Sequence, residues 1–148
     1  MRVDASVVLP LPRERAWALV TRWEQQARWL RDADRVDVLG DLREGAGVRL
    51  AVRTRVFGVP AFTEVLEVTT WRPPERLEIA HRSFVHGGGV WAFDPHELGT
   101  RFTWSEGLSL PVPGLGELAL RAYRPFLRWL MRRNFYQWSN GLLNVQLK

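Results

Sequence analysis

Two ionisable residues interrupt apolar rows in segments that alternate with the two-residue period of a β-strand. His81 shares one face of segment 76–84 with Leu77 and Ile79. Glu106 shares one face of segment 100–110 with Phe102, Trp104, Leu108 and Leu110. A carboxylate and an imidazole on one apolar face can hold a polar ligand group or act as an acid and a base. The alternative is that both side chains lie at strand ends, hydrated or paired with an arginine.

The segment 115–146 has the period of a long helix, and two amides occupy its inner direction. Its apolar stripe consists of Ala119, Tyr123, Phe126, Leu127 and Leu130, and Asn134 and Gln137 follow in the same direction. A buried amide without a partner costs about 1–3 kcal/mol. Either both amides reach a wet or ligand-filled cavity, or a kink at Pro125 rotates the second half and leaves them in solvent. The first alternative places the polar end of a pocket in the C-terminal half of the helix.

The sequence lacks the residues or spacings required for thiol chemistry, metal binding and phosphate binding. There are no cysteines, which excludes disulfides, thiolate nucleophiles and zinc sites that use cysteine. The three histidines do not have metal-ligand spacing, and we expect His86 and His96 in surface turns. Gly87–Gly89 falls between two predicted strands and is interpreted as a hairpin turn, not a phosphate cradle. We therefore expect no metal and no cofactor.

The composition is that of one globular domain covering residues 1–148. Hydrophobic residues make up 46% and charged residues 25%, and the chain contains eight tryptophans, which need a sizeable core or a cavity to line. No apolar run reaches the length of a membrane span, and the N-terminus does not have a signal-peptide layout. The sequence predicts a cytoplasmic protein.

The formal net charge is +5, and Lys148 is the only lysine. On the predicted helix, one stripe consists of Arg121, Arg124, Arg128 and Arg132. This stripe is either a solvated helix face or a peripheral contact with an anionic membrane. Nucleic acid is not expected, because basic residues are not interleaved with an aromatic platform. A monomer and a homodimer both remain open.

The elements that position these residues follow one another in a simple order. A strand at 2–9 precedes a helix that starts at Pro12 and a second short helix at about 24–30. Six strands and the long helix then follow, the strands at 35–39, 48–56, 62–71, 76–84, 90–95 and 100–110. Strands joined by short turns form an antiparallel sheet, and only the long helix is large enough to cover its apolar face.

This order and several local patterns resemble the START-like (SRPBCC) superfamily, within it the polyketide cyclase/dehydrase and lipid-transport family. The similar stretches are the helix start at Pro12–Trp17, Trp29–Leu30 with Val36–Leu39 and Gly45–Gly47, WRPPERLEI at 71–79, GTRFT at 99–103, and the end of the chain at 140–147. The resemblance implies an α+β helix-grip fold. In it, a curved antiparallel sheet of about seven strands wraps around a long C-terminal helix, with two short helices after the first strand.

The resemblance also implies a cavity between sheet and helix that takes a lipid, polyketide, quinone or similar small hydrophobic ligand. The residues expected to bind it are Trp91, Phe93, Phe102, Trp104, Glu106, Tyr123, Phe126, Leu127, Leu130, Asn134 and Gln137. The leading hypothesis is a non-catalytic binding or carrier protein. The alternative is an aromatase/cyclase-type enzyme with His81 and Glu106 as the candidate catalytic pair.

Overall fold

The computed structural model describes residues 1–30 and 32–146, with side chains described as far as Gly141. The final stretch of the family resemblance, 140–147, therefore lies largely outside the described side chains. The elements, in chain order, are β1 (Arg2–Leu9), α1 (Arg13–Val20), the short 3₁₀ helix η1 (Trp23–Gln25), α2 (Gln26–Trp29), β2 (Ala33–Leu39), β3 (Arg49–Val56), β4 (Val59–Arg72), β5 (Arg76–Arg82), β6 (His86–His96), β7 (Gly99–Ser109) and α3 (Leu115–Gln146).

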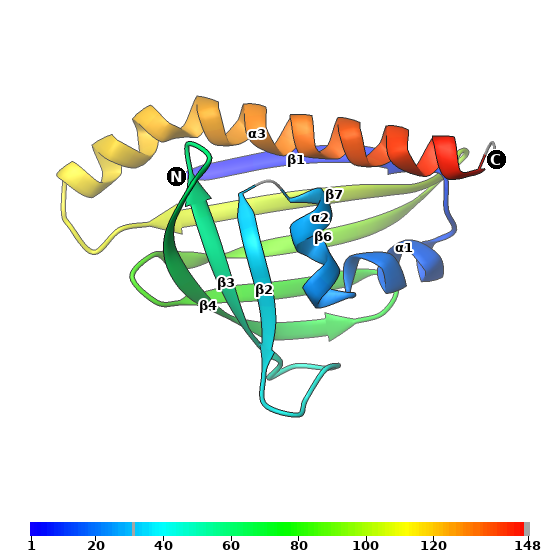
Figure 1. Cartoon of the computed structure of the whole chain (residues 1–148), viewed down its shortest axis with the longest axis horizontal. Coiled ribbons are helices and arrows are strands. Elements are labelled where there is room, and N and C mark those ends of the chain that lie inside the picture. Colours follow the sequence, from blue (N-terminus) through cyan, green and yellow to red (C-terminus); the bar gives the residue numbers. More distant parts are fainter. Residues whose placement is uncertain (31, 147–148) are drawn as a thin grey trace.

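The seven strands form one antiparallel sheet in the order β1-β7-β6-β5-β4-β3-β2. The sheet curls so strongly that β2 and β3 run across the direction of β6 and β7 (Figure 1). α3 lies along β1 and also contacts β7 and α2. This arrangement confirms the predicted α+β helix-grip fold, including the two short helical segments after β1.

The prediction of a glycine turn at Gly87–Gly89 was wrong. These residues belong to β6, and the turn between β5 and β6 lies at 83–85. The glycines are needed for close approach within the sheet. A side chain at Gly88 would meet the carbonyl oxygen of Ile79 at 2.6 Å, and one at Gly87 would collide with the carbonyl of Gly107.

α3 runs as one helix from Leu115 to Gln146 with Pro125 inside it. Its buried face carries Leu120, Leu127, Met131, Phe135 and Trp138. A regular helical face therefore continues past the proline. The second half of α3 is not turned away from the sheet, as the kink alternative required.

A cluster of aromatic side chains fills one end of the space between sheet and helices. Trp17 of α1 contacts Trp71 and Phe93, with ring centroids 5.0 and 5.2 Å apart. Trp29 and Trp138 stack at 4.3 Å with an angle of 8° between their planes, which ties α2 to the second half of α3. Such rings bury much apolar area in defined geometry, so this end of the molecule is solidly packed.

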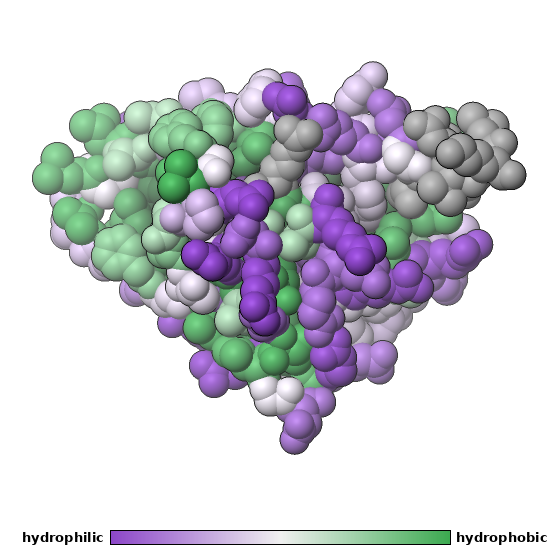
Figure 2. All heavy atoms as spheres, viewed as in Figure 1, coloured by the Kyte–Doolittle hydropathy of each residue, from purple (hydrophilic) through white to green (hydrophobic). Residues whose placement is uncertain are grey.

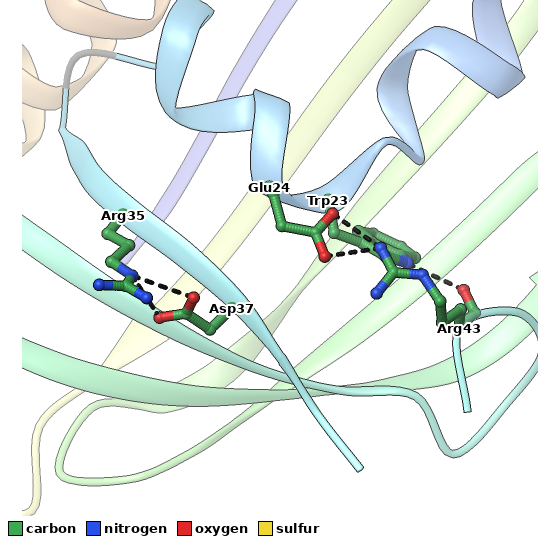
Figure 3. A network of polar contacts seen from close by, with 5 residues as sticks. All are labelled: Trp23, Glu24, Arg35, Asp37 and Arg43. Carbon is green, nitrogen blue, oxygen red and sulfur yellow. Dashed lines mark hydrogen bonds and ion pairs between the residues drawn. The ribbon is translucent and has the colours of Figure 1, made fainter. Parts of the chain in front are cut away.

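Polar contacts fix the short helical segments over the sheet (Figure 3). The indole N–H of Trp23 donates to the carbonyl of Arg43 at 2.9 Å, and the Arg43 guanidinium binds Glu24 at 2.6 and 2.8 Å. These contacts join η1 to the loop between β2 and β3. Because α2 follows η1 directly, they also position Gln26 and Leu30, which line the cavity described next.

Candidate functional site

A cavity of about 630 Å³ lies between the concave face of the sheet and the first half of α3. α3 contributes Ala119, Leu120, Tyr123, Leu127 and Met131 to its wall. The apolar lining from the sheet and its turns includes Val36, Val52, Val56, Phe62, Leu66, Ile79, Phe84, Val85, Trp91, Trp104, Leu108 and Leu110. A space of this size and polarity has the properties of a site for a small apolar molecule.

One wall of the cavity carries a hydrogen-bonded group built around His81. The Nε2 atom of His81 is bonded to Glu106, and the other carboxylate oxygen of Glu106 accepts from the indole Nε1 of Trp104 at 2.6 Å. The side chains of His81 and Glu106 are only 9% and 6% exposed. The two residues predicted from their strands thus pair with each other inside the cavity, and not with solvent or an arginine.

Glu64 of β4 approaches the opposite nitrogen of His81. Its Oε1 atom lies 3.5 Å from the Nδ1 atom of the imidazole. Burial opposes the charged imidazole, but the hydrogen bond with Glu106 and the charges of Glu106 and Glu64 outweigh it and raise the pKa of His81 to about 9. His81 is therefore an imidazolium held between two carboxylates at neutral pH.

A third carboxylate, Asp32, enters the cavity from the link between α2 and β2. Burial raises its pKa to about 6, helped by the nearby charges of Glu106 and Glu64. The side-chain amide of Asn134 lies 3.5 Å from Asp32. The ionisable group of the cavity wall therefore comprises Asp32, Glu64, His81 and Glu106.

The close packing of β6 leaves room for this group. Gly89 pairs with Glu106 across β6 and β7. A methyl group at Gly89 would lie 2.7 Å from the Oε2 atom of Glu106 and 3.1 Å from the Cγ1 atom of Ile79. The absence of a side chain at Gly89 thus leaves space for the Glu106 carboxylate beside the imidazole of His81.

The structure places about half of the predicted ligand residues in the cavity wall. Those in the lining are Trp91, Trp104, Glu106, Tyr123 and Leu127. Phe93 and Phe102 lie instead in the aromatic core, where they are 1% and 0% exposed. Both pack at the filled end of the molecule, so facing the concave side of a strand is not sufficient to reach the cavity.

Phe126 and Leu130 line a smaller neighbouring pocket of about 310 Å³. It shares only Asp32 and Arg55 with the lining of the larger cavity. The prediction for the cavity-facing stripe of α3 was therefore wrong by a small rotation about the helix axis. The residues of α3 that line the larger cavity are Ala119, Leu120, Tyr123, Leu127 and Met131.

The two amides of α3 are separated by the structure. Asn134 is 2% exposed and lies next to Asp32, outside the cavity lining, whereas Gln137 is on the exposed side of the helix. Neither alternative considered for the pair holds for both residues. The polar wall of the cavity is made by the sheet and Asp32, not by the C-terminal half of the helix as predicted.

Two members of the ionisable group were missed in the sequence. Glu64 interrupts the row Phe62, Leu66 and Val68 as Glu106 interrupts its own row, so the same pattern would have found it. Asp32 lies in a short link with no periodicity. Its position depends on how α2 joins β2, and no local pattern identifies it.

The surface of α3 bears the predicted arginine stripe. Arg121, Arg124 and Arg132 are exposed, Arg128 is half-buried, and Arg121 binds Glu117 at 2.8 Å. Exposed apolar side chains gather where α3 begins, among them Leu115 and Leu118 (Figure 2). No helix in the described part of the chain is long and apolar enough to cross a membrane. Contact of the stripe with an anionic membrane stays a prediction.

The curled sheet, the long helix packed against it and the cavity between them define the helix-grip class of proteins. A family model described as polyketide cyclase/dehydrase and lipid transport matches residues 1–137. The chain belongs to this family, as its motifs predicted. A search of curated proteins found no significant match.

Solved structures give the same fold over almost the whole chain. TTHA0849 from Thermus thermophilus is 24% identical, with 96% of this chain and 94% of that chain covered and a TM-score of 0.71. NE0264 from Nitrosomonas europaea is 17% identical, covering 99% and 96%, with a TM-score of 0.68. Ms6760 from Mycobacterium smegmatis is 15% identical, covering 97% and 92%, with a TM-score of 0.67. At these identities the likeness shows the fold alone.

Proposed function

We propose that this protein binds a small hydrophobic molecule in the cavity between its sheet and α3 and acts as a carrier. The observation that carries this proposal is the apolar cavity of about 630 Å³ with its ionisable residues gathered at one wall. The apolar lining supplies affinity by removing ligand surface from water, and the polar wall orients one end of the molecule.

The division of the molecule into a filled and a hollow end supports this proposal. Phe102, Phe135 and Trp138 pack against each other, with Phe102 5.5 and 6.0 Å from the other two rings. Among the described side chains, nothing comparable fills the space under Tyr123 and Leu127, where the cavity lies. A plain structural core would continue close-packed along the helix, since interiors leave few voids larger than a water molecule.

An enzyme of the cyclase/dehydrase type is the second candidate, and the His81 group favours it. An imidazolium that is oriented by Glu106 and faces an apolar cavity can donate a proton, and a nearby carboxylate such as Asp32 can accept one. Against this, both ring nitrogens of His81 are turned toward carboxylates. The Nε2 atom is hydrogen-bonded, and the Nδ1 atom, which has no hydrogen-bond partner among the described residues, lies beside Glu64, so a substrate would compete with a carboxylate at either nitrogen. This arrangement suits a fixed binding wall better.

Native mass spectrometry of the purified protein, followed by organic extraction, tests the proposal. The expected result is a bound apolar molecule that co-purifies and is released by solvent. If the protein emerges without adduct, it is next incubated with a series of lipids, quinones and polyketides. Failure of every member to bind would overturn the proposal.

Two variants separate the carrier from the enzyme. Glu106→Gln retains an oxygen that can accept from Trp104, while His81→Asn removes the imidazolium. A carrier returns the extracted ligand unchanged from the wild-type protein and from both variants. An enzyme converts a model ketide, and both variants abolish the conversion while binding persists. If the wild-type protein converts the ketide and neither variant does, the carrier hypothesis is wrong and the enzyme hypothesis replaces it.

A further inference from the structure

The ionisable side chains of the cavity carry more acceptors than donors. Three carboxylates, Asp32, Glu64 and Glu106, face it from three different parts of the chain, with one imidazole, His81, between them. The side chains of Glu106 and His81 are more than nine-tenths buried. These groups therefore interact with a ligand across a medium that screens charge weakly.

The donors of the wall are already directed at its own carboxylates. The Nε2 atom of His81 and the Nε1 atom of Trp104 bind the two oxygens of Glu106. The Nδ1 atom of His81 lies 3.5 Å from one oxygen of Glu64. The Nδ1 atom forms no hydrogen bond with the described residues, and a ligand carboxylate that approached it would also come close to the Glu64 carboxylate.

Arg55 is the one arginine or lysine among the described lining residues, and it is also engaged. Its guanidinium forms an ion pair with Asp34, which does not line the cavity. The guanidinium of Arg55 is directed at Asp34, which Arg53 also approaches at 3.6 Å, and not at the carboxylates of the wall. Leaving Arg55 aside, the wall holds three carboxyl groups and one imidazole.

The neutral polar groups of the lining do not offset the excess of carboxylate acceptors over charged donors. Hydroxyl groups of Thr54, Thr63, Ser83 and Tyr123 line the cavity, and a hydroxyl can both donate and accept. The indole Nε1 of Trp91 is buried without a hydrogen-bond partner in the described structure, and it supplies one neutral donor. The amide of Gln26 also lines the cavity and donates to the carbonyl of Val20. Neutral N–H groups of this kind are weak substitutes for a cation when the incoming group is an anion.

From this balance we infer that the ligand ends in a hydrogen-bond donor, a hydroxyl or an ammonium group, and that molecules ending in an ionised carboxylate are rejected. This inference rests on the proposed function, because it concerns the polar end of the same ligand. Glu64 and Asp32 accept from the donor, and the apolar lining holds the remainder of the molecule. An anion at the same place would be repelled by the carboxylates of the wall and would lose its hydration with little compensation.

Competition among three ten-carbon chains tests the inference on the wild-type protein. Decylamine, decan-1-ol and sodium decanoate displace the neutral fluorescent probe N-phenyl-1-naphthylamine at pH 7.5, each below its micelle concentration. We expect the amine and the alcohol to bind at least tenfold more tightly than decanoate. If decanoate binds as tightly as either of them, the inference is overturned while the proposed function stands. If neither the probe nor any of the three chains binds, both are overturned.

A matched pair of variants on β4 identifies the wall as the cause. Glu64→Gln removes one charge of the wall, whereas Glu67→Gln makes the same change at a residue that binds Arg82 and does not line the cavity. In Glu64→Gln the preference for decylamine over decanoate is expected to shrink by a factor of about ten. Glu67→Gln should retain the wild-type preference. An unchanged preference in Glu64→Gln, with the variant folded by circular dichroism, would contradict the assignment.

Discussion

His81 is stabilised as a cation by its position between two carboxylates from different strands. The contacts with Glu106 and Glu64 arise because β4 pairs directly with β5, and only the glycine-containing start of β6 separates β5 from β7. Neither carboxylate is near His81 in sequence. The charge state of the imidazole is therefore a property of the folded protein, and it makes the stability depend on pH.

The sign of this dependence follows from the two pKa values of His81. Folding raises the pKa from 6.5 to about 9, so the stabilisation is fully present below pH 6.5 and disappears as the pH rises to 9. The free energy of unfolding should fall by about 3 kcal/mol over this range. Urea denaturation at several pH values measures it. In His81→Asn the decrease should nearly vanish, and an equally steep decrease in that variant would refute the assignment.

Asp32 has the opposite effect on stability at neutral pH. The folded protein holds the proton up to about pH 6, whereas the ordinary carboxyl loses it near 3.8, so stability falls as the pH rises between these values. Above pH 6 the desolvated charge remains a cost. Asp32→Asn should therefore stabilise the protein at pH 8 by roughly 1–3 kcal/mol.

Asp41→Asn is the control for this prediction, because Asp41 is an exposed residue of the loop between β2 and β3. A surface change of this kind usually stays within about 0.5 kcal/mol. The same urea experiment at pH 8 compares both variants. A less stable Asp32→Asn protein would show that the carboxylate is needed for packing, contrary to the present account.

At the scale of elements, the pairing of β6 with β7 determines whether Glu106 can reach His81. A methyl group at Gly89, which pairs with Glu106, would have no space. A methyl group at Gly107 would lie 3.7 Å from its nearest atom, which is an ordinary van der Waals contact. Gly89→Ala should lower the free energy of unfolding by about 1–3 kcal/mol through overpacking. Gly107→Ala should change it much less. Thermal denaturation of the two variants measures the difference. Equal losses of stability in Gly89→Ala and Gly107→Ala would contradict the packing described.

Strand alternation predicted the faces of β5 and β7, and with them the positions of His81, Trp104 and Glu106. The same alternation on β4 contains Glu64 but was not used. It could not distinguish the filled end from the hollow end, because Phe102 and Trp104 share one strand face and differ only in what lies above them. Phe102 is covered by Phe135 and Trp138 of α3, and this tertiary contact is not specified by the alternation within one strand.

The helices show a similar limit. The bounds of α3 were predicted, since helical spacing persists over many residues, but a small error in its rotation exchanged Leu120 and Met131 for Phe126 and Leu130. Glycine was misinterpreted at Gly87–Gly89 because a glycine run indicates a turn as readily as a close backbone approach. Only the three-dimensional pairing of strands separates these two cases.

At the scale of the whole molecule, one end of the fold is closely packed and the other contains the cavity. The aromatic end, where Trp29 stacks on Trp138, holds the sheet and helices together. The other end leaves an apolar cavity with a polar wall. A ligand bound as we propose would contact the hollow end and leave the aromatic core intact.

The central claim is that an apolar molecule occupies this cavity, and one titration tests it most directly. Leu66 lines the cavity on β4, while its neighbour Val65 does not. N-phenyl-1-naphthylamine is titrated into the wild-type protein, Leu66→Trp and Val65→Trp, with excitation outside the tryptophan absorption band. We predict tight binding by the wild-type protein and Val65→Trp, and at least tenfold weaker binding by Leu66→Trp, whose larger side chain fills the space. Equal binding by all three folded proteins, or no binding by the wild-type protein, would contradict the account.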